Sequence, residues 1–211
     1  YWRAAIFLAV EAAAVSIGLS YDKKGDDQTD KYQGFAHTHW DVERYTEWTI
    51  KFAENLGVDD KYFDVYVNDK VSWEKLHQLE NQVSNYDAGM YYSHNLEEFG
   101  EQQYYEMIGK YTQFTPGWDD FENDGTYQSV FNQTTNNFDD YADMRGKAND
   151  YYNIAYKSVL VVVTNHIIGA VEAAWSANAH NKSINMEVGL KKAEYGFLTD
   201  IYPEFNLKVN F

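Results

Sequence analysis

Two closely spaced histidines near residue 40 are the first candidates for chemistry. His37 and His39, followed by Asp41 and Glu43, form the most metal-like cluster in the sequence. A His-x-His pair can ligate zinc or iron when both rings point the same way, as on a strand. A metal-dependent enzyme also needs a third ligand and an open coordination position, and the sequence identifies neither. Packing and capping within an aromatic segment is the competing interpretation.

Two acidic stretches are candidates for a hard cation, and both favour solvated loops instead. The aspartates of residues 22–30 do not have the spacing of a calcium loop. Residues 119–125 look like the start of an EF-hand loop, but Phe131 stands at the twelfth position, where a bidentate Glu belongs. Glycine-rich phosphate loops and the G-x-S-x-G and H-E-x-x-H motifs do not occur in the sequence. We therefore expect no catalytic residue and no cofactor.

A third group of polar residues stands inside the two most apolar stretches of the chain. Its members are Glu11, Asn165, His166 and Glu172. A carboxylate at membrane depth is costly and needs a partner, so we expect Glu11 to pair with His166 or Asn165. The alternative is that these groups are hydrogen-bonded inside an ordinary soluble core.

Two apolar helices must position these polar groups. Residues 4–19 predict a helix with almost no polar face, whose small residues allow another helix to approach closely. Residues 139–179 predict a helix of roughly 40 residues, capped by Asp139 or Asp140 and apolar in its second half. A bilayer span needs roughly 20 apolar residues, and residues 4–19 are at the short end of that range. We expect the two apolar segments to pair, either in a membrane or as a core.

The middle of the chain, residues 22–138, predicts a polar, aromatic-rich helical region. Asp41 is the expected N-cap of a helix closed by Gly57, and Ser72 is the expected N-cap of a second helix. Residues 101–114 predict a third, amphipathic helix that stops at a Pro-Gly pair.

The C-terminal residues 184–211 alternate apolar and polar side chains in two runs, which predicts two short strands that pair antiparallel. A length of 211 residues favours one domain over residues 1–211. The predicted fold class is mainly α: a helical domain with two paired apolar helices and a short C-terminal β-hairpin.

Composition excludes several classes of function. The 17 Lys and Arg residues against 33 Asp and Glu residues give a net charge of -16, which repels phosphate backbones and argues against a nucleic-acid partner. The absence of cysteine excludes disulfides and thiolate metal sites. The first apolar run lacks a basic n-region, so we do not interpret it as a signal peptide.

Four pieces of the sequence are similar to one group of proteins. They are residues 1–7 with Glu11; residues 25–30 followed by His39, Trp40 and Tyr45; residues 104–111 with residues 117–119; and Asn165 and His166 with Ala170, Glu172 and Ala173. Together they resemble an uncharacterised family of bacterial cell-envelope proteins, related to a domain of unknown function in Gram-negative lineages. Members carry a signal sequence and a Pro-Gly-x-Gly-Gln-x-Tyr-like stretch before the Tyr-Trp, so the resemblance implies a truncated N-terminus here. It also implies a membrane-associated location in the envelope.

Three functions remain open. The first is a non-catalytic structural or accessory protein of the bacterial cell envelope: membrane-associated, facing the periplasm, and a subunit of a larger complex, with other envelope or membrane proteins, or lipid, as partners. The second is a carbohydrate- or protein-binding module whose surface is lined by the 19 tyrosines with Trp40, Trp48, Trp73 and Trp118. Solvent-facing aromatics favour binding, and buried ones favour packing. The third is the metal-dependent enzyme at the His-x-His pair.

Overall fold

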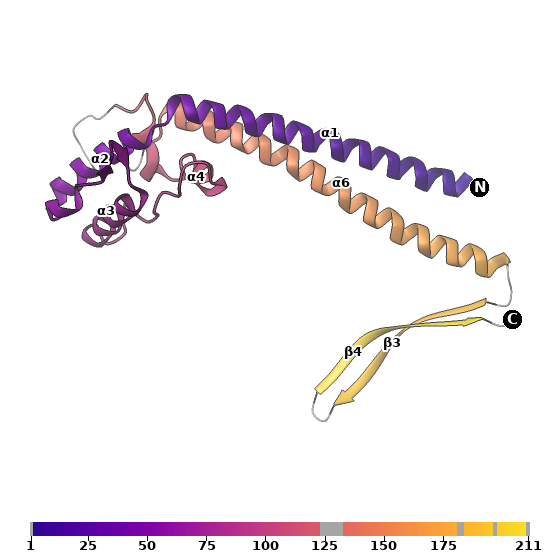
Figure 1. The fold of residues 1–211 in the computed structure, drawn as a ribbon. Helices are drawn as coiled ribbons and strands as arrows, with labels where there is room; N and C mark the ends of the chain where they lie inside the picture. The colour runs from indigo at the N-terminus through magenta and orange to yellow at the C-terminus, as the bar shows by residue number, and fades with distance from the viewer. Residues whose placement is uncertain (1, 123–132, 181–183, 196–197, 210–211) are drawn as a thin grey trace. The chain divides into compact units, whose positions relative to one another are not determined.

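The fold of the chain is mainly helical, with two long apolar helices and a C-terminal β-hairpin, as the sequence predicts (Figure 1). The computed structural model describes residues 2–122, 133–180, 184–195 and 198–209. The described elements are, in chain order, α1 (Trp2–His39), α2 (Val42–Leu56), the 3-10 helix η1 (Asp60–Tyr62), β1 (Tyr66–Val67), β2 (Lys70–Val71), α3 (Trp73–Tyr86), α4 (Gln102–Met107), the 3-10 helix η2 (Thr112–Gly117), α6 (Asn136–His180), β3 (Ile184–Tyr195) and β4 (Leu198–Val209).

Contacts between residues divide the chain into two compact units, whereas the length of the chain favours a single domain. The first, which we name the apolar unit, consists of Tyr1–Ser20 and Ile154–Phe211. The second, which we name the aromatic unit, consists of Tyr21–Asn153.

Helix α1 is longer than the sequence predicts, because the charged stretch over residues 21–30 is helical and not a loop. Contacts with Tyr152 explain the difference. Its hydroxyl donates to Asp26 Oδ1 at 2.9 Å and lies 3.2 Å from Thr29 Oγ1. Gly25 lets the Tyr152 ring lie directly against the helix backbone, in the space where any other residue would place its Cβ. Tertiary packing therefore overrides a turn-like local composition.

Helix α6 confirms the predicted long helix, but its N-cap is not one of the two predicted aspartates. The hydroxyl Oγ1 of Thr135 accepts a hydrogen bond from the backbone N–H of Phe138 at 3.2 Å, which is the geometry of an N-cap. Asp139 instead lies in the first turn of the helix, where its charge is favourable toward the helix dipole.

Helices α2 and α3 confirm the predictions made from their caps. The Asp41 carboxylate accepts from the backbone N–H groups of Glu43 at 2.7 Å and Arg44 at 3.0 Å. Gly57 closes α2 with a φ of 81°, a left-handed conformation that favours glycine. Ser72 holds the N-cap position of α3. The buried faces of both helices pack into the aromatic core of this unit.

The third predicted helix is much shorter than residues 101–114. Helix α4 ends at Met107, and the chain continues into η2. Gly109 lies where the Tyr141 ring approaches the backbone so closely that a Cβ would overlap it. The Tyr141 hydroxyl also donates to the Tyr105 carbonyl oxygen at 2.6 Å. The amphipathic spacing is correct, but the segment after Met107 packs against α6 through Tyr141 and is not helical as far as residue 114.

The C-terminal strands confirm the predicted antiparallel hairpin and extend it. Strands β3 and β4 pair over twelve positions, from Ile184 opposite Val209 to Tyr195 opposite Leu198. Because directly opposed residues share a face of the sheet, this register decides which side chains lie together.

Candidate functional site

The polar residues predicted inside the apolar stretches lie along the contact between α1 and α6 within the apolar unit. Glu11 Oε1 lies 3.5 Å from His166 Nε2, which is one of the two partners expected for it. Asn165 Nδ2 instead donates to the Phe7 carbonyl oxygen at 3.0 Å. Glu172 accepts a hydrogen bond from Arg3 at 2.7 Å and forms an ion pair with it. We name these contacts between α1 and α6 the polar seam.

The partner of Glu172 is Arg3, whose guanidinium Nη1 lies 2.7 Å from Glu172 Oε1. The sequence pattern does not identify this pair, because nothing local places residue 3 opposite residue 172. The available signal is that Arg3 and Glu11 interrupt the first apolar stretch while Glu172 interrupts the second. In two helices that pair antiparallel, residues of opposite charge are candidates for an ion pair with each other.

Small residues let the two helices approach closely beside the polar seam. A Cβ on Gly18 would lie 3.4 Å from the Ser158 Cβ, and one on Gly169 would lie 3.7 Å from the Phe7 ring. Ala14 and Ala155 are also buried. Close backbone approach through small side chains is typical of helix pairs in membranes.

The outer faces of the same helices are apolar and exposed. The exposed large aliphatic side chains include Ile6, Leu8, Val10, Val15, Ile17 and Leu19 on α1 and Val159, Leu160, Val161, Val163, Ile167, Ile168 and Val171 on α6. The most apolar 18-residue windows of α1 and α6 have mean hydropathies of 1.8 and 1.6, and only 6% and 17% of their residues are buried. By length and composition, both helices could cross a membrane.

The two histidines of the predicted metal cluster lie in the last turn of α1 and make separate contacts. His37 Nε2 lies 2.6 Å from the Tyr105 hydroxyl, and His39 Nδ1 lies 2.8 Å from Asp119 Oδ2. Residues two apart on a helix point in different directions, unlike those on a strand. Within the described part of the chain, no group of three or more His, Asp or Glu side chains could hold a metal ion. The cation candidate at residues 119–131 lies partly outside the described residues.

Burial raises the pKa of the Glu80 carboxyl to about 8, and this group sits at the centre of the aromatic unit. Glu80 Oε1 accepts from the Tyr45 hydroxyl at 2.7 Å, and the Leu96 N–H lies 3.2 Å from both carboxyl oxygens. The Gln113 amide donates to the Tyr45 hydroxyl at 3.1 Å and to the His94 carbonyl oxygen at 2.6 Å. These bonds fix the loop that follows α3. The sequence contains a signal for this buried carboxyl, because Glu80 occupies a position on the inward face of α3 that is otherwise apolar.

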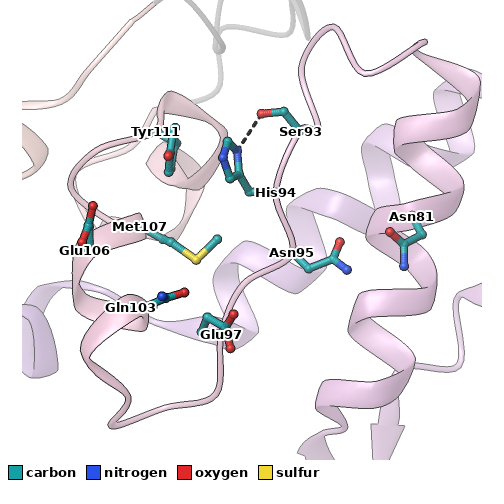
Figure 2. Close-up of a pocket in the computed structure, with 9 residues that line it drawn as sticks. All are labelled: Asn81, Ser93, His94, Asn95, Glu97, Gln103, Glu106, Met107 and Tyr111. Atoms are coloured by element: carbon teal, nitrogen blue, oxygen red, sulfur yellow. Dashed lines mark hydrogen bonds between the residues drawn. The ribbon is translucent and has the colours of Figure 1, made fainter. Parts of the chain in front are cut away.

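A polar pocket of about 560 Å³ opens beside this loop in the aromatic unit. Figure 2 shows the residues that line it: Asn81, Ser93, His94, Asn95, Glu97, Gln103, Glu106, Met107 and Tyr111. The His94 ring stacks on Tyr111 at 3.8 Å, and its Nδ1 lies 2.8 Å from Ser93 Oγ. A hydrolytic Ser-His pair needs a carboxylate to orient the imidazole, and no carboxylate in the described part of the chain bonds to this ring.

The tryptophans predicted to line a binding surface mostly lie inside the aromatic unit. Trp40, Trp48 and Trp118 are buried, and Trp73 is half-buried. Trp40 Nε1 donates to the Phe114 carbonyl oxygen at 3.0 Å, and Trp118 Nε1 donates to that of Ile108 at 3.1 Å. Buried rings whose N–H groups are hydrogen-bonded are core residues. The low exposure of these tryptophans therefore favours packing over ligand binding.

Comparison with known proteins gives no match: no family model, no curated protein and no solved structure is similar to the chain. Function has to be argued from the residues themselves.

Proposed function

We propose that this chain is a non-catalytic structural or accessory protein of the bacterial cell envelope. In this proposal α1 and α6 anchor it in a membrane as a helical hairpin, and it assembles with other envelope or membrane proteins. The observation that carries the proposal is that the helix pair leaves its large aliphatic side chains exposed while its charged side chains pair with each other across the two helices.

The aliphatic side chains of this pair are placed differently from those of a water-soluble helix pair. In water, helices bury an apolar stripe, whereas this pair leaves its large aliphatic side chains exposed. Arg3 and Glu172 form an ion pair across the two helices, and Glu11 lies beside His166. The exposed faces carry branched aliphatic side chains. A charged side chain in hydrocarbon costs about 3 kcal/mol or more when unpaired, so pairing is what a membrane requires.

Aromatic residues mark the two ends of the apolar part of each helix. In α6, Tyr156 and Trp175 are 64% and 72% exposed, and their separation corresponds to about 28 Å at 1.5 Å per residue. In α1, Trp2 and Tyr21 are separated by the same number of residues. The hydrocarbon core of a bilayer is about 30 Å thick, and Trp and Tyr are enriched at its two interfaces. The spacing of these rings supports a membrane-spanning pair.

The location in the bacterial envelope is proposed because four pieces of the sequence resemble a family of envelope proteins. One of these pieces contains Asn165, His166 and Glu172, which belong to the polar seam. For the noncatalytic role, the support is that His37 and His39 bond to different residues, Tyr105 and Asp119.

The first experiment is fractionation of native cells with and without detergent, followed by sizing of the complex that carries the chain. We expect the protein to stay with membranes through a high-salt wash, to be released by detergent, and to elute together with other subunits. Release by salt or osmotic shock as a monomer would refute the proposal.

Two matched substitutions on α6 sharpen this test. Val163→Arg places a charge on the exposed apolar face, and Asn149→Arg places one at an exposed position of the aromatic unit. Arginine near a bilayer centre costs about 3 kcal/mol of insertion free energy, whereas an exposed position in water tolerates it. We expect only Val163→Arg to lower the amount of membrane-integrated protein. Equal levels of both variants in the membrane would argue against a span.

A further inference from the structure

The C-terminal hairpin has one face made almost entirely of apolar side chains. The pairing register places Met186 opposite Leu207, Val188 opposite Phe205, and Leu190 opposite Pro203. The next pair on this face, Lys192 opposite Ile201, joins a charged side chain to an apolar one.

This apolar face is open in the described structure. Phe205 is 71% exposed, Leu190 is 76% exposed, and Val188, Ile201 and Leu207 are also exposed. The opposite face carries polar residues, including a 2.7 Å ion pair between Lys191 Nζ and Glu204 Oε1. A two-stranded hairpin is marginally stable by itself in water. Its apolar face therefore needs something to cover it.

We infer that lipid covers it: β3 and β4 lie on the surface of the membrane, with the apolar face toward the acyl chains and the polar face toward water. This inference rests on the proposed function, because it needs α6 to be in the membrane. Covalent continuity supports it. Helix α6 ends at His180 and β3 begins at Ile184, so the hairpin starts within a few residues of the end of the apolar helix.

Backbone hydrogen bonding determines that the hairpin lies on the membrane and does not cross it. Each strand has twelve residues and spans about 40 Å at 3.3 Å per residue, which is long enough to cross. A two-stranded sheet, however, leaves both outer edges without partners, and unpaired N–H and C=O groups are very costly in hydrocarbon. At the interface the edges remain in contact with water while one face contacts lipid.

The charge of the segment fits a membrane surface better than the rest of the chain does. Of the 17 basic and 33 acidic residues, four of each lie in residues 181–211, so the net charge of -16 belongs entirely to residues 1–180. The hairpin has no net charge, so anionic headgroups do not repel it, whereas they repel the acidic surface formed by residues 1–180. Its long lysine side chains can extend their charges toward water from the edge of an apolar face.

The absence of cysteine makes a direct test simple. The full chain is reconstituted in phosphatidylcholine vesicles with a nitroxide on a single cysteine at Val188→Cys on the apolar face or at Glu187→Cys on the polar face. Accessibility to oxygen, which partitions into lipid, is compared with accessibility to a water-soluble nickel chelate. We expect the ratio of oxygen to nickel accessibility to be several-fold higher at position 188 than at position 187.

Other outcomes overturn the inference and name the alternative. High nickel accessibility at both positions means that the face is open to water. Shielding of position 188 from both reagents, with dipolar broadening between labels, means that a second copy covers it. Shielding without broadening means that other parts of the same chain do. A third label at Val163→Cys on α6 separates this inference from the proposed function: if that label is also outside lipid, the membrane span itself is wrong.

Discussion

The buried carboxyl of Glu80 predicts an unusual dependence of stability on pH. Its pKa in the folded protein is about 8, against 4.5 for an ordinary Glu side chain, because burial disfavours the charged form more than the bonds from Tyr45 and Leu96 favour it. Between these values the unfolded chain has lost the proton and the folded protein keeps it. The folded state therefore loses stability as pH rises through this window.

The size of the effect follows from the width of the window. Each pH unit between the two pKa values removes about 1.4 kcal/mol, which gives a total of about 5 kcal/mol, of which about 4 kcal/mol falls between about pH 5 and about pH 9. The substitution Glu80→Gln cannot ionise and keeps an acceptor for one of the bonds. We expect the free energy of unfolding of the variant to fall less than that of the wild type by about this amount over the same range.

The assay is urea unfolding of the full chain in detergent micelles, followed by tryptophan fluorescence, since Trp40 is buried and its ring centroid lies 6.1 Å from that of Tyr45. Glu74→Gln, on the exposed side of the same helix, controls for the removal of one negative charge. A further variant, Glu80→Leu, leaves the buried Tyr45 hydroxyl and Leu96 N–H without acceptors and should be about 1–3 kcal/mol less stable than Glu80→Gln at every pH, since neither side chain ionises. If wild type and Glu80→Gln lose stability in parallel as pH rises, the reasoning about this carboxyl is wrong.

Three further substitutions test individual contacts by the free energy of unfolding in the same micelles. Gly117→Ala would place its Cβ on the Trp40 ring and should destabilise by about 1–3 kcal/mol, whereas Gly34→Ala, an open position of α1, should stabilise by about 1 kcal/mol; equal effects would contradict the close approach. Asp41→Ala removes both N-cap bonds of α2 and should cost about 1 kcal/mol, and no loss would show that the cap is redundant. Asn165→Leu removes the amide bond across the helix pair and should cost about 0.6 kcal/mol, the average for such bonds in membranes; a loss of several kcal/mol would contradict that setting.

Local sequence patterns were sufficient where neighbouring residues alone determine the structure. Asp41 and Gly57 delimit α2 correctly, because an N-cap bond and a left-handed closing residue depend only on neighbouring backbone. The alternation of residues 184–190 and 205–211 predicts the hairpin for a similar reason: side chains in a strand alternate faces regardless of what covers them.

Signals failed where a distant side chain decides the outcome. The aspartates and lysines of residues 21–30 have a loop-like composition, but contacts with Tyr152 keep them helical. The amphipathic period of residues 101–114 continues beyond Gly109, yet α4 ends at Met107 and the Tyr141 ring lies against the backbone of Gly109. Neither aromatic partner can be paired with its glycine from spacing, because both lie far along the chain on α6.

The polar seam shows the same limit at the candidate site. Glu11, Asn165, His166 and Glu172 are identifiable from sequence as polar residues in apolar surroundings, but a helix that is apolar on all sides does not reveal which way it faces. A soluble core and a membrane pair predict the same helices and the same polar contacts. They differ in where the remaining aliphatic side chains point, which depends on the three-dimensional packing. The exposed valines and isoleucines opposite the seam are what the proposed membrane span requires, because water would favour burying those side chains.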